Sequence, residues 1–450
     1  MSATSPASPA APVAQAPSHA GEIVARALDA IDRLDPDLHA WVAVDREGAM
    51  RAARASERLI RLGRARSELE GVPIGVKDVI DTKGLRTGYG SPLFESHVPP
   101  RDARVIARLR RSGVVVVGKT TTTPFAMFDP AATHNPWNLA RTPGGSSSGS
   151  AAAVAAGMVR LAVGTQTSGS TIRPAAFCGV VGFVPSSRRI SRLGIFPCSP
   201  SLDRVGLFAR SVADVARLFE ACATGTERAR PGGGRFGQAI DDVDHRVAVP
   251  EPLVARAAPE MTDAMALATS VLERIGVTVW PVPLAGFERA LAANMTIMQV
   301  EVACTHRELF GSQSDAYPPG LRDFILQGQA VSVRSYRAAL RERRRFRDLV
   351  EQLLGRFDAL LSPAAPGEAG SRSSTGDPVM NVIAGLSDAP AVTIPVTLSR
   401  AGLPLGIQLV GSADAEANLL HLAARVEREI AFRPLPPLHV SRRDLWLARP

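Results

Sequence analysis

Three polar residues lie in segments whose composition suits nucleophilic catalysis. Lys77 ends the strand-like segment GVPIGVKD, Ser146 lies in the loop PGGSSSGSAAAVAAG, and Ser170 lies in the loop GTQTSGSTIRP. A serine hydroxyl becomes a useful nucleophile when a neighbouring base removes its proton, and a buried lysine can be that base if it is neutral. The three residues could therefore work together if the fold brings them close.

Lysine is rare in this chain, so the position of each one is informative. Lys77, Lys83 and Lys119 are the only lysines among 52 basic residues. A buried lysine can lose its proton, whereas an arginine in practice cannot. Proton-transfer chemistry is one reason why a lysine would be kept in a chain whose other basic residues are arginine.

Ser146 and Ser170 lie 24 positions apart, joined by a segment that reads as a small-residue helix and a short strand. A single serine-rich loop is usually a linker or a helix cap. Two such loops around an alanine-rich helix, downstream of a rare lysine, are hard to explain as linkers. We expect Ser146 and Ser170 to meet at one sheet edge.

Two further segments match the sequence patterns of known motifs but lack the local structure that these motifs require. Segment 113–120 (GVVVVGKT) fits the P-loop pattern, but its four valines favour a stiff strand over a phosphate-binding turn. Segment 145–149 (GSSSG) fits the nucleophile elbow of α/β-hydrolases, but a polar, proline-containing loop precedes it instead of a strand. We treat both segments, and all eight histidines, as structural.

The elements that must position these residues alternate between strands and helices. Apolar runs indicate strands at 72–76, 114–117, 161–165, 246–249, 277–280, 359–361, 391–395 and 405–410. Amphipathic segments indicate helices at 22–35, 47–62, 104–111, 150–158, 212–223, 260–274 and 414–429, the first ending before Pro36. This alternation predicts an α/β fold with helices covering a sheet.

Length and composition favour one large domain. The chain has 450 residues, of which 45% are hydrophobic, and no apolar stretch reaches the ~20 residues of a membrane helix. We expect a disordered leader over 1–20, one domain over 21–450, and a possible flexible insertion at 225–237. Four separated cysteines without a CxxC pair argue against a zinc site or disulfides and fit the cytoplasm.

The net charge of +9 permits a nucleic-acid-binding protein. Arginines cluster in segment 341–347, but acidic residues are interspersed there, which favours a solvated helix face. Aromatic residues make up only 5% of the chain, which leaves few for base stacking. We expect neither a nucleic-acid partner nor a membrane partner.

The segment from Gly71 to Pro185 resembles the amidase signature family. The matching motifs are GVPIGVKD, GKT, NPWNLARTPGGSSSGSAAAVAAGM and GTQTSGSTIRPAAFCGVVGFVPS, and the later segments PAVTIPV and GLPLGIQLVG are similar to the family's closing strands. The resemblance implies an α/β fold with a single large mixed β-sheet covered by helices on both faces. It also implies acyl transfer without a metal or cofactor.

The family's Ser–cis-Ser–Lys triad can be carried over to matching positions. The resemblance implies that Ser170 is the nucleophile, that Ser146 bridges after a cis peptide, and that Lys77 is the base. It implies an oxyanion hole made by the backbone N–H groups of Thr167, Ser168, Gly169 and Ser170.

Two positions depart from the family's common GTDTGGS loop: Gln166 replaces the acid and Ser168 replaces a glycine. Arg173 resembles an arginine of malonamidase-like members that binds a substrate carboxylate. A structural ion pair that holds the loop is the alternative, and we favour it. Phe125, Met127 and Phe128 could line an acyl pocket, but core positions are the expectation we favour.

The resemblance predicts an amidohydrolase that cleaves a small or medium-sized linear amide with water. The same triad could hydrolyse a carbamate or an ester. A third alternative is the glutaminase subunit of a tRNA-dependent amidotransferase, which passes ammonia to a partner protein. We expect a monomer or homodimer.

Overall fold

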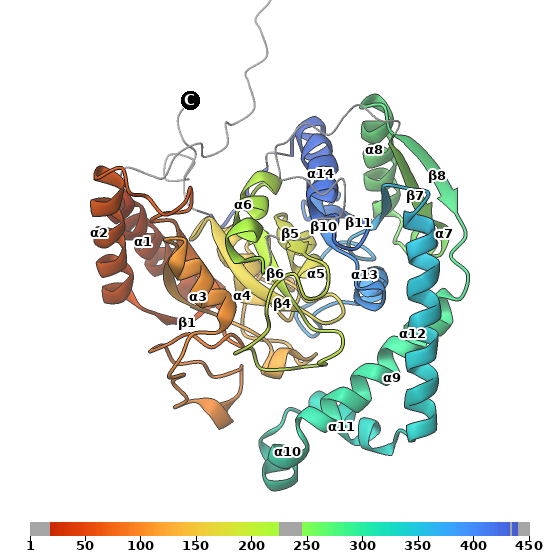
Figure 1. Ribbon diagram of the computed structural model, residues 1–450, viewed down its shortest axis with the longest axis horizontal. Coiled ribbons are helices and arrows are strands. Elements are labelled where there is room, and N and C mark those ends of the chain that lie inside the picture. The colour runs from red at the N-terminus through yellow and green to blue at the C-terminus, as the bar shows by residue number, and fades with distance from the viewer. Residues whose placement is uncertain (1–18, 225–244, 433, 440–450) are drawn as a thin grey trace, which may run out of the picture.

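The computed structural model describes residues 19–224, 245–432 and 434–439 (Figure 1). Within these ranges eleven strands form one mixed sheet in the order β1-β3-β2-β4-β6-β5-β10-β11-β9-β7-β8. The strands are β1 (Trp41–Val44), β2 (Pro73–Lys77), β3 (Val115–Thr120), β4 (Leu161–Gln166), β5 (Val181–Val184), β6 (Arg204–Ala209), β7 (Arg246–Pro250), β8 (Thr278–Val282), β9 (Ala359–Pro363), β10 (Ala391–Leu398) and β11 (Pro404–Gly411). The predicted single mixed sheet is confirmed.

Strand direction brings the segments that end at Lys77 and Gln166 to one edge of the sheet. β2 pairs in parallel with β4, with Val76 opposite Val163, whereas β4 pairs with β6 in the antiparallel sense. Parallel neighbours end at the same edge. The carboxyl end of β2, at Lys77, therefore lies beside the loop that follows Gln166 at the end of β4.

Helices cover both faces of this sheet, as predicted. On one face α1 (Ala20–Leu38), α2 (Arg46–Arg61) and α4 (Ser148–Ala155) contribute to one buried apolar cluster. On the other face α3 (Arg104–Arg111), α6 (Val212–Cys222), α8 (Glu260–Arg274) and α14 (Glu416–Ile430) contribute to a second. Each layer buries the apolar side of its helices against the strands, which is the main source of stability.

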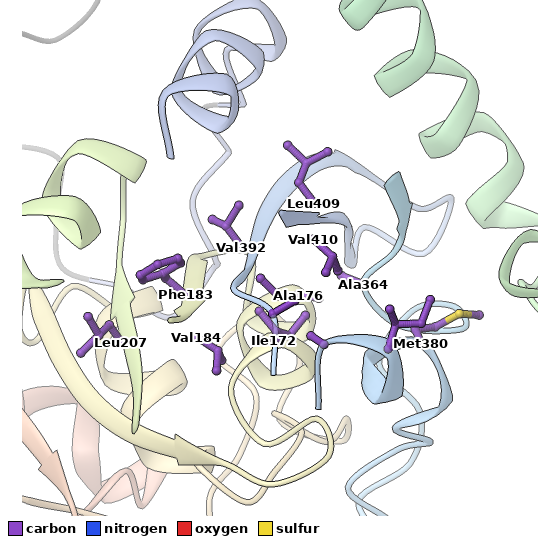
Figure 2. Close-up of a cluster of buried hydrophobic side chains, with 14 of the residues drawn as sticks. Ile172, Ala176, Phe183, Val184, Leu207, Ala364, Met380, Val392, Leu409 and Val410 are labelled. Atoms are coloured by element: carbon purple, nitrogen blue, oxygen red, sulfur yellow. The ribbon is translucent and has the colours of Figure 1, made fainter. Parts of the chain in front are cut away.

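The short helix α5 (Ile172–Cys178) begins directly after the second serine loop and is anchored in the core. Figure 2 shows Ile172 and Ala176 of α5 among buried side chains, most of which come from the central strands. The labelled neighbours are Phe183, Val184, Leu207, Ala364, Met380, Val392, Leu409 and Val410. This packing holds the residues just before α5 in place.

The middle of the chain forms a helical arm at one end of the molecule (Figure 1). It consists of α9 (Phe287–Thr305), α10 (Arg307–Gln313), α11 (Pro319–Ala330) and α12 (Val333–Leu354). The remaining helices are the short α7 (Glu251–Val254) and α13 (Val382–Ser387). The arginine-rich segment 341–347 lies in α12, a helix as predicted.

Some predicted boundaries were wrong. α1 continues through Pro36 to Leu38, because a proline in the last turn removes only one N–H donor and His39 N still donates to Asp35 O at 2.8 Å. β1, β5, β6 and α5 were not predicted, since they are short and rich in glycine or polar residues. The predicted insertion at 225–237 and nearly all of the leader lie outside the described residues.

No helix within the described ranges is long and apolar enough to cross a membrane. Among the same residues Cys178, Cys198, Cys222 and Cys304 are free thiols. Lys119, the lysine of the P-loop-like segment, is fully buried in β3 and donates to Thr87 Oγ1 at 2.8 Å. Its strand position confirms the structural interpretation of that segment.

Candidate active site

Lys77 is a buried amine whose partners are hydroxyl groups. Its side chain is fully shielded, and Nζ donates to Ser146 Oγ and to Thr165 Oγ1, both at 2.7 Å. Burial lowers the pKa of Lys77 to about 7, because desolvation disfavours the charged ammonium. Asp78 lies on the other side of the strand, where it accepts from Gly88 N at 2.9 Å. Lys77 is therefore poised between its neutral and charged forms near neutral pH.

Ser146 lies in the loop before α4, and the peptide bond between Gly145 and Ser146 is cis. Its side chain is buried beside Lys77. A Cβ on Gly145 would lie 2.6 Å from Thr375 Cγ2, so a larger residue at position 145 would have to displace the Thr375 side chain. In contrast, Ser147 Oγ, at the centre of the elbow-like GSSSG segment, is buried and donates to Thr165 O at 3.1 Å. Ser147 is thus a structural residue.

Ser170 is half-buried and lines a pocket at the carboxyl end of β4. Its carbonyl oxygen accepts from Ser147 N at 3.3 Å, which joins the two serine loops. Among the described residues its hydroxyl has no hydrogen-bond partner, and no bond joins it to Ser146 Oγ. The structure therefore brings Lys77 and Ser146 into direct contact and places the Ser170 hydroxyl at the pocket.

The loop over 167–170 also lines this pocket. Within the described part of the chain, the backbone N–H groups of Ser168, Gly169 and Ser170 have no acceptor. A Cβ on Gly169 would lie 2.5 Å from Asn381 Oδ1 and 2.8 Å from Arg173 Nη1. Glycine is therefore required where the loop approaches these two side chains, and free N–H groups remain beside Ser170.

The other pocket walls are largely apolar and rich in sulfur. They are formed by Ala126, Met127, Phe128, Cys198, Met298 and Pro378, together with Arg173 and Thr375. Met127 and Phe128 thus both line the pocket. Met127 is also buried in the core, as we favoured, whereas Phe128 is exposed, which corrects the core position favoured for it. Phe125 does not line the pocket: its ring is fully buried and stacks on Tyr317 at 5.3 Å. Phe125 therefore occupies the core position that we favoured for it, with left-handed backbone (φ 50°).

Arg173 holds a neighbouring loop, but not through an ion pair. Nε donates to Thr375 O at 2.7 Å and Nη2 donates to Gly145 O at 2.8 Å. No described carboxylate forms an ion pair with it, so the ion pair that we favoured was wrong. Nη1 is buried without a partner, and burial lowers the pKa of the guanidinium to about 10. One nitrogen of a charged side chain that lines the pocket is thus buried without an acceptor.

The two departures from the family loop have clear local roles. Gln166 Oε1 accepts from Thr171 N at 2.9 Å and from Ile172 N at 3.0 Å, so an amide caps the start of α5. Ser168 Oγ accepts from Asn294 Nδ2 at 3.2 Å and donates to Met298 Sδ at 2.9 Å. Ser168 therefore ties the loop to α9 of the helical arm.

Sequence reasoning missed several residues of this site. Thr165 contacts Lys77 directly, and Cys198, Met298 and Thr375 contribute pocket walls. Thr165 lies at the end of β4 beside the end of β2, a proximity that the strand pairing creates and that the sequence does not report. The other three come from distant segments and carry no local signal.

Within the described residues, no cluster of three or more histidine, cysteine, aspartate or glutamate side chains could hold a metal ion. Hydroxyls, a guanidinium and backbone N–H donors line the pocket, and the buried Lys77 amine, outside the pocket lining, is bonded to Ser146 Oγ. Such a set can remove a proton from a hydroxyl and stabilise an oxyanion.

Comparisons with known proteins agree with this chemistry. The sequence profile described as Amidase matches residues 22–420. The A subunit of the glutamyl-tRNA(Gln) amidotransferase of Anaeromyxobacter sp. (strain K) is 35% identical over 466 aligned residues, which cover 92% of this chain and 94% of that protein.

Solved structures are similar over nearly the whole chain. One is a chain from a vestigial protein complex that reveals the evolutionary origins of an s-triazine catabolic enzyme; it is 27% identical, has a TM-score of 0.86, and the match covers 93% of this chain and 96% of that chain. Another is a crystal structure of an amidase (TM-score 0.81, 29% identity, 91% of this chain and 96% of that chain). The chain therefore belongs to the amidase signature family and is a hydrolase of carbon–nitrogen bonds.

Proposed function

We propose that the protein cleaves the C–N bond of small or medium-sized linear amides through an acyl-enzyme. The observation that carries this proposal is the buried Lys77 amine, bonded to Ser146 Oγ at 2.7 Å while Ser170 lines the adjoining pocket. A lysine with a pKa near 7 can accept a proton at neutral pH, which an ordinary lysine cannot. The site can therefore activate a serine without a histidine.

In the proposed first step, Ser170 Oγ attacks the amide carbon. Its proton passes to Ser146 Oγ, while the Ser146 proton passes to neutral Lys77 Nζ. This transfer needs a hydrogen bond between the two serines in the substrate complex, and catalytic hydrogen bonds often form only when substrate is bound. The proton then returns through Ser146 to the leaving nitrogen, so that an amine departs and an ester to Ser170 remains.

In the second step, a water molecule attacks this ester by the same route, and a carboxylic acid is released. The negative charge on the carbonyl oxygen in both steps needs donors. The N–H groups of Thr167, Ser168, Gly169 and Ser170 are the proposed oxyanion hole. One such donor contributes about 3 kcal/mol to transition-state stabilisation.

The pocket indicates which acyl groups fit. Met127, Phe128 and Met298 offer an apolar, adaptable wall, since methionine side chains repack easily. The unpartnered Nη1 of Arg173 would donate to a carboxylate or carbonyl oxygen on the acyl part of the substrate. We propose these four residues as the substrate-binding set, without Phe125.

A panel of aryl amides, primary amides, carbamates and esters, each with and without a carboxylate on the acyl chain, tests this function. We expect the purified protein alone to release a carboxylic acid and an amine from at least one amide, in a stoichiometry of one to one. If the protein hydrolysed carbamates or esters but no amide, the carbamate or ester alternative would take the place of this proposal. Product analysis by mass spectrometry distinguishes these cases.

The pKa of Lys77 predicts how activity depends on pH. The base must be neutral, so kcat/KM should fall as pH decreases through about 7 and reach a plateau above it. The change should follow a single protonation, with a tenfold loss for each pH unit on the acid side. A plateau that extends down to pH 5, measured with an amide that does not titrate, would remove Lys77 as the base.

A second candidate function is favoured by the 35% identity to the A subunit of a glutamyl-tRNA(Gln) amidotransferase. In this case the protein would hydrolyse glutamine and pass ammonia to a partner. Incubation with glutamine, with and without candidate partner proteins, followed by ammonia measurement, separates the two proposals. Hydrolysis of other amides without a partner protein supports the first proposal.

The expected cytoplasmic location stays a prediction.

A further inference from the structure

A carboxylate outside the triad is bonded to the loop that carries the proposed oxyanion hole. Asp203 lies just before β6, next to the end of β4, and is half-buried. Thr167 Oγ1 donates to Asp203 Oδ1 at 2.6 Å. Cys198 N donates to Oδ2 at 2.9 Å, and Ser199 N donates to both oxygens, at 3.0 and 3.1 Å. Thr167 and Cys198 both line the pocket.

These contacts join two walls of the pocket through one side chain. Thr167 is the first residue of the 167–170 loop, and Cys198 lies in the segment that faces it. Ser168 Oγ ties the loop to α9 and Ser170 O accepts from Ser147 N, but Ser168, Gly169 and Ser170 donate no backbone hydrogen bond within the described part of the chain. Loss of the carboxylate would free Thr167, and with it the orientation of the following N–H groups.

Asp203 also brings a negative charge near the base. Both of its oxygens accept hydrogen bonds, an arrangement that suits the ionised form, although burial raises its pKa. Its charge favours the protonated form of Lys77. Cys198 faces Lys77 too, but burial raises the pKa of its thiol, which keeps it neutral. Arg192 faces Asp203, and Glu301 of α9 accepts from Ser199 Oγ at 2.7 Å.

We propose that Asp203 is a positioning residue for amide hydrolysis, which orients the oxyanion loop through Thr167 and sets the charge near Lys77. This inference rests on the proposed function. It explains why an acidic side chain is kept close to a base whose neutral form is needed: the carboxylate fixes the loop geometry, and burial of Lys77 offsets its charge. Asp203 contacts no reacting atom, so it acts through Thr167.

The test compares Asp203→Asn, Thr167→Val and the double variant, with the best amide from the substrate panel. The asparagine side chain would keep the shape but lose the charge and the ability to accept from several N–H groups. We expect kcat to fall about 10²-fold in Asp203→Asn, with KM changed less than threefold, since oriented N–H donors act mainly in the transition state. Thr167→Val should lose kcat similarly, and the double variant should lose no more than the larger single loss.

The pH profile separates the two roles of Asp203. Removal of its charge favours neutral Lys77, so the acid limb of kcat/KM should move to lower pH in Asp203→Asn. It should stay in place in Thr167→Val, which keeps the carboxylate. Thr167→Ser, which keeps the hydroxyl, should restore most of kcat.

Asp35→Asn is a matched control. Asp35 is a half-buried carboxylate that accepts from two backbone N–H groups, of Ala40 at 2.6 Å and Trp41 at 3.2 Å, away from the pocket. The Asp35→Asn variant should unfold at a lower temperature, but its kcat and the acid limb of its kcat/KM profile should match those of the wild-type protein. The inference would be overturned if Thr167→Val kept the wild-type kcat. It would also be overturned if a folded Asp203→Asn kept the wild-type kcat and the acid limb of its kcat/KM profile did not move. The proposed function would then still stand if Ser170→Ala is inactive.

Discussion

Lys77→Arg is expected to reduce kcat/KM by about 10³-fold, although the substitution keeps a positive charge and hydrogen-bond donors. Arginine cannot lose its proton in a protein, so it can donate to Ser146 Oγ but cannot accept from it. Lysine at the same site has a pKa of about 7 because it is fully buried. The two residues thus differ in the one property that the proposed base needs. Steady-state kinetics at pH 8, where wild-type Lys77 is mostly neutral, gives the comparison its largest contrast.

Two further variants make this result interpretable. Lys77→Met removes the amine but keeps an unbranched side chain, so a folding defect caused by the larger guanidinium would not affect it. Lys83→Arg is the matched control, since Lys83 is exposed and lies outside the pocket lining. We expect Lys77→Met to be as inactive as Lys77→Arg and Lys83→Arg to match wild type. If Lys77→Arg, with normal thermal unfolding, kept more than a tenth of wild-type kcat/KM, lysine would not be the base.

The parts of the site that could be predicted from the sequence are those encoded in short, continuous segments. Lys77 ends an apolar strand, and two small-residue loops contain Ser146 and Ser170, so strand order alone brings these segments to one edge. The parallel pairing of β2 with β4 agrees with the helices that lie between these strands in the chain. Alternating strands and helices thus predicted a sheet covered by helices, whereas its mixed strand directions were expected only from the family resemblance.

The remaining features depend on contacts between distant segments. Arg173 binds the carbonyl oxygens of Gly145 and Thr375 rather than a carboxylate, a partner choice that no local pattern encodes. Asp203 meets Thr167 only because β6 pairs with β4. Phe125 was paired with Met127 as a possible pocket wall, although left-handed backbone at Phe125 and Ala126 directs these neighbours differently. Spacing along the chain does not report such turns.

Ser170→Ala is expected to lower kcat by at least about 10⁴-fold while leaving the fold and substrate binding nearly intact. Ser170 has the open hydroxyl at the pocket, whereas Ser146 is buried against Lys77. Only Ser170 can therefore reach a substrate carbonyl carbon directly. Removing its Oγ eliminates the covalent intermediate, so the residual rate would come from water attack in the same oxyanion hole.

The covalent intermediate gives a readout that rate measurements lack. An activated aryl ester or carbamate that acylates rapidly and deacylates slowly should add one acyl group to the wild-type protein, and peptide mapping should place it on Ser170. Ser170→Ala should show no adduct, whereas Ser146→Ala should form the same adduct on Ser170 more slowly, because it lacks only the proton relay. Ser373→Ala, at an exposed serine outside the pocket lining, should behave as wild type. An adduct on Ser146 in the wild-type protein would exchange the roles of the two serines, since the nucleophile must be the residue that carries the acyl group.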